Sequence, residues 1–216
     1  MEAVTTEYIP YECKIPEVVR IWKYNGVCKM RVGVISDTHN PSVGDEPPVE
    51  VVSAFAGVDV IIHAGDIYQS ACLDWLEKIA PVYAVELGAG AHFQNDPRVV
   101  DMARVLELEG HSIGLTHDLL VPGMAQEVTQ FTPLAKHFPP DRDLSAALET
   151  VFDAKVDIVI FGHTHYPVVE EYQGILMVNP GSPSLPKQIR RLGQVAIMEL
   201  GPDLKNAEIL DLSTFS

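Results

Sequence analysis

The sequence has few cysteines, and none of them forms a metal-binding pair. Its three cysteines, Cys13, Cys28 and Cys72, are far apart and include no C-x-x-C motif. This scarcity argues against a thiolate zinc ribbon and against a disulfide framework, and it suits a reducing compartment. We therefore expect a cytoplasmic protein.

Basic residues are also scarce, and no long apolar run is present. The chain has 15 lysines and arginines against 30 acidic residues, a formal net charge of −15. This charge argues against partners bound by phosphate neutralisation, such as nucleic acid, and against anionic membrane surfaces. No apolar run reaches the ~18 residues of a membrane span. The N-terminus has no basic region followed by an apolar one, so no signal peptide is expected.

What the chain does have is enough apolar sequence for a large core. Its 216 residues are 47% hydrophobic, and a chain of this length can bury roughly 70% of its unfolded surface. Residues 1–29 show no clear period, and we interpret them as an N-terminal extension to one domain over residues 30–216. The extension is either an early start upstream of Met30 or a segment that docks on the domain.

The first half of that domain alternates apolar strands with helices, which is typical of a parallel sheet with crossover connections. The second half has the rhythm of antiparallel strands and contains an irregular excursion over 118–142 that could cover a site. We expect strands over 31–36, 58–62, 82–85, 105–108, 112–116, 157–161, 168–172, 175–178, 194–200 and 207–210, and helices over 48–56, 70–79 (capped by Ser70) and 144–152. The predicted class is α/β, with two sheets packed face to face and helices outside, in about four layers.

Four of the expected strands end in side chains that can bind metal. These side chains are Asp37 and His39, His63 and Asp66, His117, and His163 and His165. The carboxyl ends of strands in α/β sheets line the ligand crevice, so these residues are expected to converge. In an extended chain, alternation would place both side chains of D-x-H and of H-x-H on one side. We expect His63 to pack in the apolar strand end instead of binding metal.

The ligand types indicate the class of metal. Asp and His without Cys suit Mn, Fe, Zn or Ni better than calcium. Two metal ions about 3.5–4 Å apart need a bridging ligand, and a carboxylate with its two oxygens is a natural bridge. Gly65 would let the backbone turn tightly before Asp66.

Several of these motifs resemble those of a known family. S-D-T-H (36–39), H-A-G-D (63–66), a lone His117 after a strand, G-H-T-H (162–165) and V-N-P-G-S (178–182) occur in the order typical of the calcineurin-like metallophosphoesterase superfamily. Within it, the chain is most similar to the small bacterial and archaeal phosphodiesterase group related to the retromer scaffold subunit. The resemblance runs from about Met30 to the C-terminus and implies a four-layer αββα sandwich with a dinuclear metal centre and two mixed sheets.

The resemblance also implies a ligand set and a mechanism. It places Asp37, His39, Asp66 and His165 on one divalent ion, and Asp66, His117 and His163 on the other, with Asp66 as the bridge. A metal-activated hydroxide would then attack phosphorus in line, so no serine or cysteine nucleophile would be needed.

The third motif departs from the family pattern. In relatives it reads G-N-H-D or G-N-C-D, and its asparagine binds the second metal. Aligned on Gly88, the asparagine position here is Ala89, which has no donor atom. Either Asn95 or His92 would replace it, with His92 also a candidate for protonating the leaving group, or water would fill the position and leave a weaker site.

The predicted function is that of a metal-dependent phosphohydrolase, best described as a phosphodiesterase acting on a small phosphorylated substrate. Two alternatives stay open. One is a protein-interaction scaffold with weak or no catalysis, and the other is a phosphomonoesterase or protein phosphatase. The sequence leaves open whether the protein forms a homo-oligomer.

Overall fold

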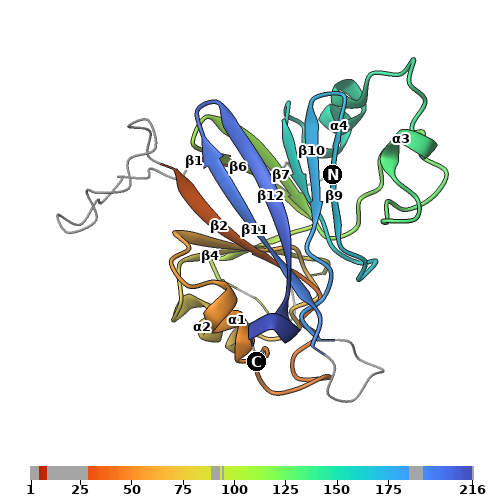
Figure 1. Ribbon diagram of the computed structural model, residues 1–216. Helices are drawn as coiled ribbons and strands as arrows, with labels where there is room; N and C mark the ends of the chain where they lie inside the picture. The colour runs from red at the N-terminus through yellow and green to blue at the C-terminus, as the bar shows by residue number, and fades with distance from the viewer. Residues whose placement is uncertain (1–4, 9–28, 89–92, 94, 185–191, 216) are drawn as a thin grey trace.

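Two six-stranded sheets face each other, and helices pack on their outer faces (Figure 1). The computed structural model describes residues 5–8, 29–88, 93, 95–184 and 192–215. Both sheets are mixed, with parallel and antiparallel neighbours. The predicted α/β class with two facing sheets is confirmed. In the described part of the chain, no helix has the length and apolar character needed to cross a membrane.

One sheet carries half of the six predicted metal ligands, Asp37, His39 and Asp66, just after the ends of its strands. Its order is β12-β11-β2-β3-β4-β5, and β2 to β5 run parallel while β11 pairs antiparallel with both β2 and β12. The strands are β2 (Met30–Ile35), β3 (Val60–His63), β4 (Val82–Glu86), β5 (Val99–Asp101), β11 (Gln194–Gly201) and β12 (Leu204–Asp211). Its helical elements are α1 (Glu50–Ala54), α2 (Ser70–Glu77) and the 3₁₀ helix η2 (Leu212–Phe215).

The other sheet has the order β1-β6-β7-β8-β10-β9. Its strands are β1 (Thr5–Tyr8), β6 (Ala103–Leu108), β7 (His111–Thr116), β8 (Ile158–Ile160), β9 (Val168–Tyr172) and β10 (Ile175–Asn179). Strands β6 and β7 form an antiparallel hairpin. Helix α4 (Leu144–Phe152) lies where it was predicted, and α3 (Leu134–His137) is the single regular element of the excursion over 118–142.

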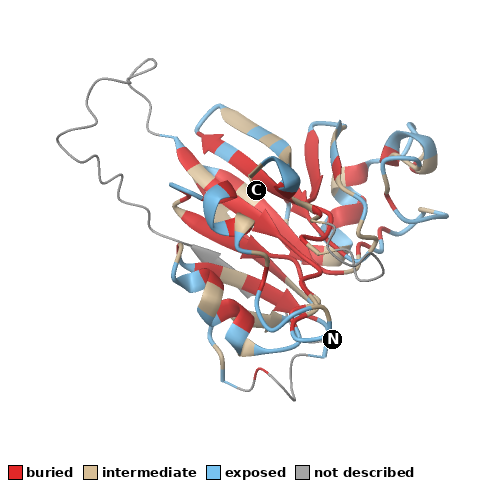
Figure 2. Cartoon of the chain, turned by 60° about the horizontal axis from the view of Figure 1, so that its bottom comes forward, coloured by how far each residue is buried: buried red, intermediate tan, exposed pale blue. Residues whose placement is uncertain are grey.

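The apolar strands are buried on both faces, which explains why they read as continuous apolar runs. In β2, Val32 and Val34 face the core between the sheets, whereas Ile35 faces the layer beneath α1 and α2. A third apolar cluster lies between α4, the excursion and the second sheet. Figure 2 shows these buried residues as a continuous interior. Three apolar layers between four layers of secondary structure hold the strand ends of the site in place.

Three local expectations need correction or addition. Ser70 is the first residue of α2 and not its cap, because Gln69 occupies the N-cap position and no side chain caps the helix. Strand β5 was not predicted. Strand β1 was not predicted either; it belongs to residues 1–29 and pairs parallel with β6.

His111 ties the two sheets together through an ionic network. Its Nδ1 lies 2.7 Å from Asp157 Oδ2, and its Nε2 lies 2.9 Å from the Gly201 carbonyl and 3.0 Å from that of Leu204. Lys205 Nζ also lies 3.5 Å from the Asp157 carboxylate. Since both ring nitrogens face acceptors, both donate and the ring is favoured in its charged form.

We expect His111→Gln to destabilise the protein most at low pH. Burial lowers the pKa of His111, but the Asp157 carboxylate and the Gly201 carbonyl outweigh burial and raise it. The stabilisation is therefore complete below the unfolded-state pKa of about 6.5 and is lost as pH rises through the folded-state pKa. Urea unfolding at pH 5.5 should show a loss of about 1–3 kcal/mol, typical of a charged hydrogen bond. An equal loss at pH 5.5 and at pH 9 would contradict the network.

Candidate metal centre

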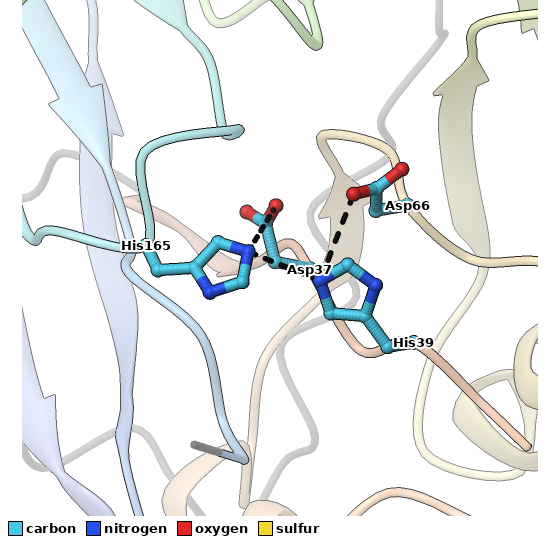
Figure 3. Close-up of side chains that lie close together, drawn as sticks. All are labelled: Asp37, His39, Asp66 and His165. Carbon is cyan, nitrogen blue, oxygen red and sulfur yellow. Dashed lines mark hydrogen bonds and ion pairs between the residues drawn. The ribbon is translucent and has the colours of Figure 1, made fainter. Parts of the chain in front are cut away.

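Four of the predicted ligands converge where their strands end. One ligand atom each from Asp37, His39, Asp66 and His165 lies within 4.8 Å of all the others (Figure 3). The Nε2 atoms of His39 and His165 are 3.0 Å apart. His165 Nε2 is 3.3 Å from Asp37 Oδ1, and His39 Nε2 is 3.6 Å from Asp66 Oδ2. Two imidazole nitrogens and two carboxylates facing one point form a donor set that suits a divalent cation.

The backbone at these residues is left-handed, and the predicted extended alternation is wrong. Asp37 and His39 have φ of 53° and 49°, and His163 and His165 have φ of 71° and 59°. Asp66 has φ of 54°. Non-glycine residues rarely adopt positive φ, and such strain concentrates at functional sites. Left-handed turns, and not strand pleating, therefore direct these side chains to one point.

Backbone hydrogen bonds join the loops that carry the ligands. The Asp37 amide donates to the Gly65 carbonyl at 2.9 Å, and the His39 amide donates to the Asp66 carbonyl at 2.9 Å. The His163 amide lies 3.2 Å from both Asp37 carboxylate oxygens. These bonds join three separate chain segments in one arrangement.

The segment 178–182 packs against the loops of the site. Asn179 Nδ2 donates to the Gly162 carbonyl at 2.8 Å, and its Oδ1 accepts from the Gly181 amide at 2.9 Å. Ser182 Oγ donates to the Asp37 carbonyl at 2.8 Å. The motif thus supports the two loops that carry Asp37 and the two histidines of G-H-T-H.

Two positions at the site require glycine, because neighbouring atoms lie too close for a Cβ. Gly65 has φ of 97°, and a Cβ on it would lie 2.6 Å from His117 Nδ1. A Cβ on Gly162 would lie 2.8 Å from both Asp37 Oδ2 and Ser36 Oγ. Any side chain at either position would therefore push a predicted ligand out of place.

The remaining two predicted ligands lie beside this group but outside the four-residue set. His117 is buried, and its Nδ1–H donates to the Ala64 carbonyl at 2.7 Å, which leaves Nε2 free 3.6 Å from Asp66 Oδ2. The rings of His117 and His163 meet edge to face with centroids 5.4 Å apart. His163 Nε2 lies 3.5 Å from Glu127 Oε1, a carboxylate of the excursion.

Electrostatics keep the first set ready to bind a cation. Burial alone raises the pKa of Asp37, but hydrogen bonds from His165 and Ser36 hold it below its usual value. Burial lowers the pKa of His39, which favours a neutral ring with a free nitrogen. The hydrogen bond to Asp37 raises the pKa of His165 while no cation competes for it.

His63 packs as a neutral core residue, in keeping with the sequence analysis. It is fully buried, and burial lowers its pKa to about 3. Its Nδ1 accepts from the Gly65 amide at 3.2 Å, and its Nε2 lies 3.1 Å from Thr38 Oγ1. Both ring nitrogens are thus engaged in holding the loop before Asp66.

The two residues suggested as replacements for the missing asparagine have different outcomes. His92 lies outside the described residues. Asn95 is exposed, and among the described residues it makes no hydrogen bond. The described structure therefore supports neither residue as a metal ligand.

Two residues that the sequence analysis missed lie at the site. Tyr68 Oη is 2.8 Å from His39 Nδ1, so it can hold that ring with Nε2 toward the other donors. Glu86 is the last residue of β4, is 7% exposed, and accepts the Ile67 amide through Oε2 at 2.8 Å. Burial, aided by the charges of Asp66 and Asp37, raises the pKa of Glu86 to about 7. The sequence feature that could have identified Glu86 is its position at the end of a parallel strand.

Comparison with known proteins agrees with this geometry. Residues 30–202 match the model of the calcineurin-like phosphoesterase superfamily domain. A probable metallophosphoesterase of Methanothermobacter thermautotrophicus is 32% identical over 84% of this chain and 92% of its own length. A phosphodiesterase of Methanocaldococcus jannaschii is 24% identical over 70% of this chain and 83% of its own.

Solved structures show the same fold. Vacuolar protein sorting 29 from Cryptosporidium parvum aligns with a TM-score of 0.60 and 21% identity over 85% of this chain and 97% of its own. An archaeal phosphodiesterase aligns with a TM-score of 0.53 and 19% identity over 84% of this chain and all of its own. With the family model covering most of its length and the donor residues gathered at its strand ends, this chain belongs to the calcineurin-like phosphoesterase superfamily.

Proposed function

We propose that the protein is a metal-dependent phosphodiesterase. The observation that carries this proposal is the convergence of Asp37, His39, Asp66 and His165 within 4.8 Å, with His117 Nε2 3.6 Å from the Asp66 carboxylate. The Methanocaldococcus jannaschii relative bears the name phosphodiesterase, which favours a diester as the substrate class. The substrate would be a small phosphorylated molecule.

The donor set suits two divalent ions that share one carboxylate. Asp37, His39, Asp66 and His165 would hold one ion, and Asp66, His117 and His163 would hold the other. Nitrogen and oxygen donors without sulfur suit Mn, Fe, Zn or Ni. When bound, such a pair lowers the pKa of a coordinated water from 15.7 to about 7 and stabilises the charge that develops on the phosphoryl oxygens.

The residues of the chain prepare this centre in three ways. Asp37 is kept ionised by its hydrogen bonds and also accepts the His163 amide. The Ala64 carbonyl fixes the tautomer of His117, and Tyr68 holds the ring of His39. The contacts to His117 and His39 are made through Nδ1, which leaves the Nε2 of each ring to face the ion.

Metal removal and reloading test the proposal. Purified protein loaded with Mn²⁺ should hydrolyse bis-p-nitrophenyl phosphate; EDTA should abolish turnover, and fresh Mn²⁺ should restore it. The monoester p-nitrophenyl phosphate, measured alongside, separates a phosphodiesterase from a phosphomonoesterase. No turnover of either ester with Mn, Fe, Zn or Ni would overturn the proposal in favour of a protein-interaction scaffold.

A further inference from the structure

The carboxylate of Glu86 lies at the edge of the metal centre. Strands β3 and β4 run parallel with His63 opposite Ala84, so Glu86 follows two residues beyond that pair, beside the loop that carries Asp66. Glu86, Asp66 and Tyr68 line one hollow of about 380 Å³. The end of β4 thus presents a carboxylate to the same hollow as the loop that follows β3.

One of the two oxygens of Glu86 is engaged by a backbone amide. Oε2 accepts the Ile67 amide at 2.8 Å, which anchors the residue directly after Asp66. Among the described residues, Oε1 has no hydrogen-bond partner. The carboxylate interacts electrostatically with Asp66, His117 and Asp37, which belong to the proposed ligand sets.

Anchoring the Ile67 amide does not by itself explain a negative charge here. A neutral glutamine would accept the same hydrogen bond. In the described part of the chain, no lysine or arginine pairs with Asp37, Asp66 or Glu86. With no lysine or arginine beside it, the buried Glu86 carboxylate is costly to hold ionised close to the charges of Asp66 and Asp37 unless a cation neutralises it.

We propose that Glu86 supplies the second metal ion with the oxygen ligand that Ala89 cannot provide. This inference rests on the proposed function, because it completes the ion held by Asp66, His117 and His163. The free Oε1 would bind the ion while Oε2 keeps the Ile67 amide in place. The family pattern has a neutral asparagine amide as this ligand, so the carboxylate changes the charge of the centre as well as its composition.

The extra charge favours a particular class of substrate. Two divalent ions carry four positive charges, and three carboxylates neutralise three of them, whereas a neutral amide would leave one more positive charge. Lowering the charge of the centre weakens its electrostatic attraction for a dianionic monoester more than its attraction for a monoanionic diester. Glu86 therefore makes the centre selective for phosphodiesters.

Replacing Glu86 by glutamine separates the two roles of the carboxylate. Glu86→Gln keeps an acceptor for the Ile67 amide but removes the charge. Calorimetric titration with Mn²⁺ alone should show two ions in the wild type. In the variant the first affinity should be kept and the second lowered at least tenfold, the minimum expected from metal-site losses. Wild-type affinity for both ions in Glu86→Gln would overturn the proposal.

Glu170→Gln is the matched control. Glu170 also accepts backbone amides, those of Leu134 and Ala135 at 2.8 and 3.1 Å, but belongs to β9 and is not among the donors of the centre. It should leave both Mn²⁺ affinities unchanged. If Glu86→Gln fails to fold by circular dichroism, Glu86→Ala gives the same titration readout, and two ions bound with wild-type affinity there would equally refute the ligand.

Turnover then distinguishes this inference from the proposed function. In Glu86→Gln the ratio of diester to monoester turnover should fall about tenfold, because the loaded centre gains one positive charge. A wild type that binds two Mn²⁺ ions but cleaves no ester would refute the function and leave the ligand assignment standing. An active wild type with an unchanged ratio in Glu86→Gln would refute the selectivity role.

Discussion

Asp66→Asn should abolish both metal binding and turnover. Asp66 Oδ2 lies 3.6 Å from His39 Nε2 and 3.6 Å from His117 Nε2, so one carboxylate stands between the two proposed ligand sets. Removing its charge weakens the binding of both ions at once. The rate of diester hydrolysis should therefore fall on the order of 10³-fold, which exceeds the 10- to 100-fold loss typical of substitutions around the metal ligands. Bound metal measured by atomic emission should fall toward zero.

The substitution is chosen so that the fold survives. Asparagine matches aspartate in shape and tolerates the positive φ at this position. Asp45→Asn, at an exposed carboxylate in the loop between β2 and α1, is the matched control and should keep both metal and activity. An Asp66→Asn protein that retains two ions per chain would refute the shared carboxylate.

Gly65→Ala should be the most destabilising small substitution at the site. Its φ of 97° is strained for any L residue, and the new Cβ would lie 2.6 Å from His117 Nδ1. Left-handed strain costs roughly 1–2 kcal/mol, and displacing a buried, hydrogen-bonded ring should bring the total to about 2–4 kcal/mol. Urea unfolding measures this loss, and metal affinity should fall with it because His117 moves.

Gly57→Ala isolates the strain from the clash. Gly57 has φ of 75°, but a Cβ there would meet nothing within 4 Å. The substitution should therefore lower the free energy of unfolding only by the cost of the left-handed backbone, about 1–2 kcal/mol. Equal losses in the two variants would mean that His117 does not depend on the space beside Gly65.

The strand framework was predictable because its signals are local. Runs such as 58–62 and 157–161 are apolar and β-branched over one strand length, and both form strands of the two sheets. The left-handed ligand loops were not predictable from alternation. Their φ values arise from contacts between distant segments, such as the Asp37 amide with the Gly65 carbonyl.

The weakest part of the sequence reasoning concerned charged residues outside the motifs. The role of His111 could not be predicted, because its partners, Asp157 and the Gly201 carbonyl, are 46 and 90 residues away in sequence. Glu86 was not predicted as a ligand, because the family motif places the ligand position at Ala89, and the substitutes considered were residues that follow it in sequence. In both cases the sheet topology, and not the neighbouring sequence, determines what the side chain meets.

The left-handed ligand loops restrict how this enzyme family member can be redesigned. Valine, isoleucine and threonine at positions 37, 39, 66, 163 or 165 would oppose the backbone itself, in addition to lacking suitable donor atoms. Libraries meant to change metal preference should therefore draw on asparagine, aspartate, histidine and glycine at these positions. Broader variation belongs on the excursion over 118–142, apart from Glu127, whose carboxylate lies 3.5 Å from His163 Nε2.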